Sequence, residues 1–178
     1  MQRWRVLITY ASPMGSTLEV AQAIAEVLAR RSFSVDVRPV DEIEHLEGYQ
    51  AVIVGSPIRF QQWLPEAKHF VQTHRDALRQ LPVVYFALSG LMSDPTPQHF
   101  HEVYDWLSEV RDLVEPLEVG IFAGALHYDR LEHNQLVQVL SKGLPEGDFR
   151  RWQDIRAWAE DVADRLQLEL ARREINRI

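Results

Sequence analysis

The 178-residue chain alternates short apolar runs, rich in β-branched and aromatic residues, with longer segments of helical period. This alternation is typical of βαβ units around a parallel sheet that is covered on both faces. We therefore predict an α/β fold, a doubly wound sandwich with a five-stranded parallel sheet, formed by one domain over residues 1–170. The predicted strands are residues 5–10, 34–39, 50–55, 82–88 and 118–123.

Apolar stripes at helical spacing predict the helices between these strands. Three stripes comprise Val20, Ile24, Val27 and Leu28; then Leu64, Ala67, Phe70 and Val71; then Phe100, Val103, Tyr104, Leu107 and Val110. A last helix follows Asp148 and carries Trp152, Ile155, Trp158, Ala159, Val162 and Leu166 on one face, which we expect to dock on the sheet rather than on a membrane. Residues 41–48 are short and acidic enough for at most a turn or two of helix. Residues 171–178 contain three arginines, and we expect them to fray as a C-terminal tail.

Composition narrows the classes of function. The chain is 46% hydrophobic and 25% charged, as in ordinary globular proteins, and it has no cysteine, which excludes disulfides, zinc-thiolate sites, iron-sulfur clusters and a cysteine nucleophile. A net charge of -7 disfavours nucleic acid as a partner, because phosphate neutralisation needs clustered Lys and Arg. No apolar run approaches the roughly 18 residues of a membrane helix, and the first residues lack a signal-peptide core. We expect a cytoplasmic protein.

The loop after the first strand is a candidate phosphate site. Ser12, Ser16 and Thr17 offer hydroxyl groups, Gly15 lets the backbone approach an anion, and the following helix start supplies unpaired N–H groups and a favourable dipole. The motifs of a nucleoside-triphosphate loop and of a dinucleotide loop are both missing. A mononucleotide remains the natural ligand, while the alternative is an ordinary helix start with Ser16 or Thr17 as N-cap and Gly15 as turn residue.

Two further loops offer contacts for a ring system. Pro57, Ile58, Arg59 and Phe60 follow the third strand, and Ser89 and Gly90 follow the fourth. Aromatic faces can stack on such a ring, so Phe60 is the first stacking candidate and Trp63 the second, although core packing is favoured for Trp63. Arg59 can bind an anion or remain a solvated surface cation.

Residues 8–21 resemble the flavodoxin signature in Tyr10, Ser12, Gly15, Thr17 and Ala21, while Thr9 stands where an apolar residue is usual. The resemblance implies the strand order 2-1-3-4-5 and flavin mononucleotide (FMN) as cofactor. It implies that residues 12–17, including Met14, Gly15 and Ser16, hold the phosphate, that residues 57–60 frame the flavin ring, and that Ser89 and Gly90 line its far side. Electron-carrier flavodoxins usually place an aromatic residue in the loop after the fourth strand, and here residues 87–92 contain none.

The segments Gly55 to Phe60 and Ala123 to Tyr128 are similar to flavodoxin-type, quinone-dependent (menaquinone-dependent) protoporphyrinogen IX dehydrogenases of haem biosynthesis. That resemblance implies an FMN-dependent oxidoreductase that oxidises a porphyrinogen and passes electrons to a quinone or a redox-protein acceptor, with at most peripheral contact to the inner face of the membrane. Arg59, His127 and Tyr128 are then candidate substrate contacts. Gln61 replaces an expected glycine, His127 an expected arginine, and residues 129–148 carry few cations.

Two other functions stay open. The chain can be a flavodoxin-like electron-transfer protein without a small-molecule substrate, or a flavodoxin fold that has lost flavin and serves as an interaction module. His99 and His101 suggest a metal pair, but residues two apart on a helix face different directions, so we expect no metal. The sequence leaves the oligomeric state undetermined.

Overall fold

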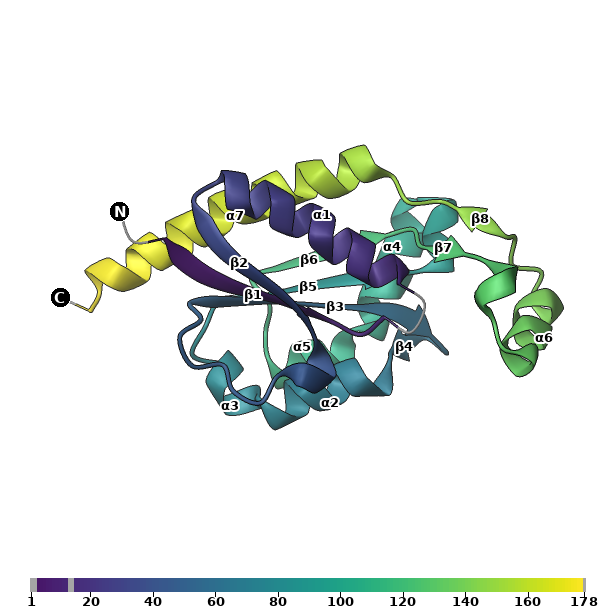
Figure 1. Cartoon of the computed structure of the whole chain (residues 1–178), viewed down its shortest axis with the longest axis horizontal. Coiled ribbons are helices and arrows are strands. Elements are labelled where there is room, and N and C mark those ends of the chain that lie inside the picture. Colours follow the sequence, from purple (N-terminus) through teal and green to yellow (C-terminus); the bar gives the residue numbers. More distant parts are fainter. Residues whose placement is uncertain (1–2, 13–14, 178) are drawn as a thin grey trace.

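The computed structural model describes residues 3–12 and 15–177. Five parallel strands form its main sheet in the order β2-β1-β3-β5-β6, which confirms the predicted fold class and strand order (Figure 1). β1 lies near the centre of the sheet, where Ile8 pairs in register with Val37 on one side and Ile53 on the other. The strands are β1 (Trp4–Tyr10), β2 (Phe33–Pro39), β3 (Ala51–Arg59), β5 (Val83–Leu88) and β6 (Glu118–Phe122).

Helices cover both faces of the sheet, as the apolar stripes predict. On one face lie α1 (Ser16–Arg30) and α7 (Trp152–Ile175), and on the other lie α2 (Pro65–Thr73), α3 (Arg75–Leu78), α4 (Pro97–Trp106) and α5 (Ser108–Leu113). Each layer has its own buried cluster: Ile24 and Ile155 belong to the first, and Phe70 and Val103 to the second. The second and third predicted helices are each divided in two, at His74 and at Leu107. Residues 40–42 form a short 3-10 helix, η1 (Val40–Glu42).

The third strand extends beyond its predicted end at Gly55. It continues to Arg59 because its last residues pair antiparallel with β4 (Gln62–Trp63), through Ile58 with Trp63 and Arg59 with Gln62. Phe60 and Gln61 form the two-residue turn, and both have positive φ, 50° and 61°. Two consecutive residues of this kind are typical of the type I′ hairpin turn, which usually contains Asn or Gly.

A small substructure follows β6 and stands at one end of the molecule, where Figure 1 shows it in green. It comprises β7 (Ala125–Leu126), η3 (Tyr128–Arg130), α6 (His133–Ser141) and β8 (Gly147–Asp148), and β7 pairs antiparallel with β8. We call residues 125–148 the insert. Glu132 and Gln135 form a reciprocal capping box at the start of α6.

The expectation of a frayed tail is wrong, because α7 continues through Ile175. Two arginines of this last stretch, Arg172 and Arg173, pair with Glu169, and Arg173 also donates to the carbonyl of Gln80 at 2.8 Å. Trp4 donates to Glu174 at 2.7 Å, which ties the helix end to β1. Residues 171–175 are therefore part of the folded domain.

Candidate functional site

The turn between β1 and α1 is built as an anion cradle. Gly15 is the N-cap of α1 in the left-handed region (φ 84°), and the space a side chain would fill there is open. The N-cap position is occupied by Gly15, which has no side chain, so the alternative of Ser16 or Thr17 as N-cap does not describe this turn. The Ser12 hydroxyl accepts from the backbone N–H of Leu18 at 3.4 Å. Met14 lies outside the described residues.

Thr17 provides the test of whether this turn fits a flavin phosphate. Its side chain is fully buried, and its Oγ1 has no hydrogen-bond partner within the described residues. A buried hydroxyl without a partner costs free energy, so a ligand oxygen beside it would be stabilised. The open glycine, the neighbouring hydroxyls and the start of a 15-residue helix suit a phosphate group. The residues present therefore fit the group that the flavodoxin resemblance implies.

A cavity of about 400 Å³ begins at this turn and brings together residues at or just after the ends of four strands, β1, β3, β5 and β6. Its volume lies within the range of small-molecule sites, about 300–1,000 Å³. Most of the predicted site residues line it: Ser12, Ser16, Thr17, Pro57, Ile58, Arg59, Phe60 and Gly90. Ser89 is not among its lining residues, because its hydroxyl instead accepts from the backbone N–H of Leu91 at 3.2 Å and begins the 3-10 helix η2 (Gly90–Ser93).

The mouth of the cavity carries one exposed aromatic ring and two cations. Phe60 is 68% exposed, and the Lys142 Nζ lies 5.1 Å from the centre of its ring. Neither Arg59 nor Lys142 forms an ion pair or a side-chain hydrogen bond among the residues described. Trp63, in contrast, is only 1% exposed and packs edge-to-face on Tyr85 with ring centres 5.0 Å apart, which confirms its expected place in the core.

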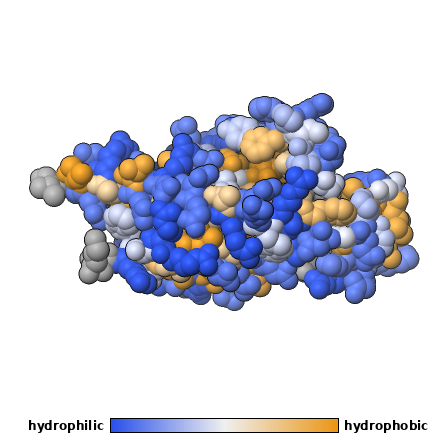
Figure 2. Space-filling model, turned by 90° about the horizontal axis from the view of Figure 1, so that it is seen from above, coloured by the Kyte–Doolittle hydropathy of each residue, from blue (hydrophilic) through white to orange (hydrophobic). Residues whose placement is uncertain are grey.

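Sequence reasoning missed the insert as a wall of this cavity. The lining contributed by the insert and the residue after it is mostly apolar: Ala125, Leu126, Leu131, Gln135, Gln138, Val139, Lys142, Leu144, Pro145 and Phe149. The capping-box pair Glu132 and Gln135 is a readable signal for α6, and positions 135, 138, 139 and 142 share one helical face. The other face of α6 exposes Val137 and Leu140, and Figure 2 shows hydrophobic atoms at this end of the molecule.

His127 and Tyr128 do not line the cavity. Tyr128 instead holds the two ends of the insert together: its hydroxyl donates to the carbonyl of Leu144 at 2.6 Å, and its backbone N–H donates to Glu146 at 3.0 Å. His127 lies beside Asp129 and Glu146, with one possible ligand atom of each within 4.8 Å of the others. Both carboxylates are exposed, and this cluster alone does not define a metal site. His99 and His101 belong to no such group in the residues that the structure describes.

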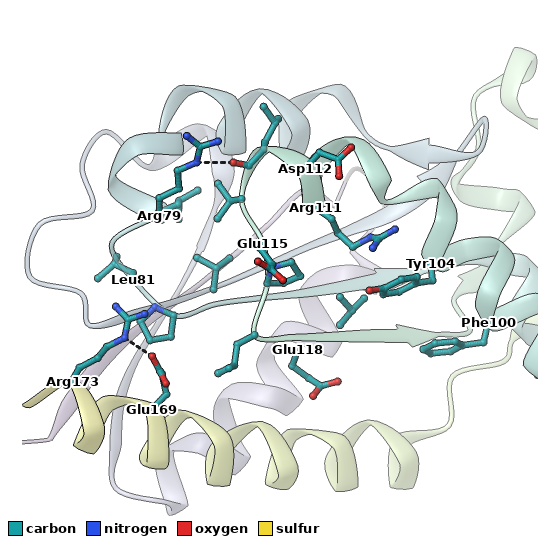
Figure 3. Close-up of a pocket in the computed structure, with 18 residues that line it drawn as sticks. Arg79, Leu81, Phe100, Tyr104, Arg111, Asp112, Glu115, Glu118, Glu169 and Arg173 are labelled. Carbon is teal, nitrogen blue, oxygen red and sulfur yellow. Dashed lines mark hydrogen bonds and ion pairs between the residues drawn. The ribbon is translucent and has the colours of Figure 1, made fainter. Parts of the chain in front are cut away.

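A second and larger hollow, of about 1070 Å³, lies at the opposite ends of the strands, where β5 and β6 begin (Figure 3). Two of its arginines bind protein groups: Arg79 donates to the carbonyl of Leu113 and Arg173 pairs with Glu169. Arg111 lies against the ring of Tyr104, 3.8 Å from its centre. Because doubly wound sheets bind ligands at the carboxyl ends of their strands, the cavity beside Thr17 is the candidate site.

Comparison with known proteins agrees with this geometry. A family model described as flavodoxin domain matches residues 7–146. The chain belongs to the flavodoxin domain family. Within this family it is 26% identical to protoporphyrinogen IX dehydrogenase (quinone) of Escherichia coli, over an alignment covering 89% of this chain and 94% of the relative.

Two other comparisons extend this picture. A Leishmania major protein with the same name is also 26% identical, with 89% of this chain and 74% of that protein covered. Among solved structures, an archaeal flavodoxin superposes with a TM-score of 0.55 at 16% identity, covering 92% of this chain and 99% of that one, which shows a shared fold. Across the described part of the chain, no helix is both long enough and apolar enough to span a bilayer.

Proposed function

We propose that this flavodoxin-family chain binds FMN in the 400 Å³ cavity and acts as an oxidoreductase. Family membership supports this proposal, and so does the buried Thr17 hydroxyl, which has no partner among the residues that the structure describes. Ser12, Gly15, Ser16 and Thr17 would hold the phosphate, where first-turn N–H groups and the helix dipole favour a dianion. The contact of Met14 with the phosphate stays a prediction, because this residue lies outside the described part of the chain.

Once bound, FMN would supply hydride or electron transfer, while the chain supplies binding and orientation. Pro57 and Ile58 line the cavity beside the expected ring position, and Gly90 lies on the loop expected at its far side. Arg59 places a guanidinium at the mouth, where it can stabilise negative charge on the ring or bind a substrate carboxylate. The insert covers the cavity with apolar residues and reduces the access of water.

We further propose a reduced tetrapyrrole, a porphyrinogen, as substrate and a quinone as electron acceptor. The observation that carries this proposal is the lining of the cavity mouth. It includes the exposed ring of Phe60 and two cations without ion-pair partners in the described chain, Arg59 and Lys142, of which Lys142 lies against that ring. Such a mouth suits a molecule with aromatic pyrrole rings and carboxylate groups. Each turnover would remove two hydrogen atoms from the porphyrinogen and deliver them to the quinone, which leaves as the quinol. The names of the 26% identical relatives support the same reaction.

An electron carrier without a small substrate is the second candidate. The net charge of -7 favours docking on a basic redox protein, as expected for such carriers. The apolar cover that the insert forms over the cavity favours the enzyme, because an electron carrier needs an exposed edge of the flavin ring rather than a covered cavity. Localisation in the cytoplasm, with peripheral contact to a membrane that holds the quinone, follows only from the enzyme proposal.

Two measurements test these proposals in order. The absorbance spectrum of the purified protein and chromatography of the cofactor released from it should identify FMN, and protein that neither retains nor rebinds flavin would overturn the binding proposal. Anaerobic protoporphyrinogen IX with a soluble quinone should then give porphyrin fluorescence faster than the same mixture without protein. The holoprotein can instead fail to exceed the uncatalysed rate and, in its reduced form, pass electrons to a basic cytochrome. That result would overturn the enzyme proposal in favour of the electron carrier.

A further inference from the structure

Arg150 is a nearly buried cation next to the phosphate turn, and the proposed function does not use it. Its side chain is only 6% exposed, although it lies in the short segment between β8 and α7. The guanidinium donates to both carboxylate oxygens of Asp148, at 2.9 and 2.7 Å. It also donates to the carbonyl of Ser16 at 3.3 Å and pairs with the Glu19 carboxylate. The ring of Trp152 lies against it, 4.6 Å from the guanidinium carbon.

These contacts join two parts of the molecule that are far apart in sequence. Ser16 and Glu19 belong to the first turn of α1, which forms one wall of the phosphate turn, and Asp148 belongs to the strand that closes the insert. A planar guanidinium has several donors in a fixed arrangement, so it sets the relative position of the groups that it binds. Its hydrogen bonds with Asp148 lower the pKa of that carboxyl below its usual value, so the pair stays charged at neutral pH.

Charge near the turn gives Arg150 a second role. The turn itself, residues 11–18, contains no cationic side chain, while Glu19 and Asp148 place two carboxylates close by. A phosphate dianion entering the turn would be repelled by these carboxylates if their charge were not offset. Arg150 pairs with both of them, while Arg59, the last residue of β3, and Lys142, the C-cap of α6, lie at the mouth of the cavity.

We propose that Arg150 is a positioning residue for the phosphate group of the flavin. It holds the first turn of α1 against β8 and offsets the charge of Glu19 and Asp148, so that the turn accepts a dianion without a cation of its own. This inference rests on the proposed function in one respect, namely that the cavity binds a phosphorylated flavin. It requires no particular substrate or electron acceptor.

The experiment compares two flavins that differ only in the phosphate. Apoprotein is titrated with FMN and separately with riboflavin, and binding is followed by the quenching of flavin fluorescence. In Arg150→Gln, the dissociation constant for FMN should rise about 10- to 100-fold, the range expected for the loss of one to two charge-assisted hydrogen bonds. The constant for riboflavin should change less than about threefold, because riboflavin leaves the turn empty.

Three variants serve as controls. Arg151→Gln removes the neighbouring exposed arginine, which has no side-chain partner among the described residues, and should leave both constants unchanged. Arg150→Lys keeps the charge but not the planar fork, and should fall between wild type and Arg150→Gln. Glu19→Gln added to Arg150→Gln should recover part of the FMN affinity if offsetting charge matters. Circular dichroism melts establish that each variant is folded, and Arg150→Lys carries the test if Arg150→Gln does not fold.

The outcomes separate this inference from the proposed function. If the wild-type apoprotein binds neither flavin, the proposed function fails before any variant is measured. If the wild type binds FMN but Arg150→Gln and Arg150→Lys leave its affinity intact, or weaken FMN and riboflavin equally, then Arg150 is structural and the inference is overturned. A selective loss of FMN affinity supports it.

Discussion

The hairpin turn between β3 and β4 contains backbone strain that a single substitution should relieve. Gln61 has φ 61° and an exposed side chain, and it occupies a type I′ position that favours glycine. For a residue with a Cβ, the left-handed region costs roughly 1–2 kcal/mol. Glycine removes that cost but loses about 0.5–1 kcal/mol more conformational entropy on folding than a residue such as alanine. Gln61→Gly should therefore stabilise the protein by about 0.5–1 kcal/mol.

Thermal unfolding of the apoprotein, followed by circular dichroism, measures this change. For a domain of this size, about 1 kcal/mol shifts Tm by roughly 2–4 °C, so an increase of about 1–4 °C is expected. Urea unfolding should give a higher midpoint with an unchanged slope, because the exposed side chain adds little to the surface that unfolding exposes.

Two control substitutions separate the backbone effect from the loss of a side chain. Ser32 also has positive φ, 70°, far from the cavity in the turn between α1 and β2, so Ser32→Gly should stabilise to a similar degree. Gln72 is exposed inside α2, where glycine should destabilise by about 1 kcal/mol. Should Gln61→Gly lower Tm while Ser32→Gly raises it, the Gln61 side chain would be making a stabilising contact, and the strain argument would be refuted for this turn.

Three further changes test other parts of the structure. Thr9→Val removes a fully buried hydroxyl without a partner in the described residues and should stabilise by about 1 kcal/mol in urea unfolding; a loss of stability would reveal a hidden hydrogen bond. Gly55→Ala would place its Cβ 1.9 Å from the ring of Phe86, which is fully buried, so Tm should fall with a loss of at least about 1–3 kcal/mol, and an unchanged Tm would contradict this packing. Burial lowers the pKa of His74 below 6.5, so the unfolded chain binds more protons and stability should decline as the pH falls through 6.5 toward the folded-state pKa; His74→Gln should remove this part of the slope between pH 5 and 7.5.

The strands could be predicted from sequence because parallel strands covered on both faces are nearly continuous apolar runs. Val6, Leu7 and Ile8 are all fully buried, so their hydropathy alone marks β1. The phosphate turn could be located for a similar reason, since the chemistry of its hydroxyls and Gly15 is local to six residues. The hydropathy of β1 and the chemistry of the phosphate turn are both set by residues that are adjacent in the sequence.

The insert could not be predicted in the same way. No residue of α6 is buried, so its apolar stripe is weak. Its place over the cavity depends on residues far away in the sequence, such as Phe60, which lies 82 positions before Lys142. The extension of β3 to Arg59 depends on pairing with β4 across a turn whose residues, Phe60 and Gln61, do not resemble the usual hairpin pair. The helical continuation of residues 171–175 depends on Glu169 and on β1, which a local reading of the arginine-rich sequence could not include.

The position of α7 in the chain has a consequence for biosynthesis. Residues such as Ile155, Val162 and Leu166 complete the buried layer that α1 and the sheet share, yet they leave the ribosome after every strand of the main sheet. Until then, a nascent chain would present part of that layer to solvent, the kind of surface that recruits chaperones or aggregates. Premature termination before Trp152 should therefore yield insoluble product, even though all residues lining the cavity would already have been made.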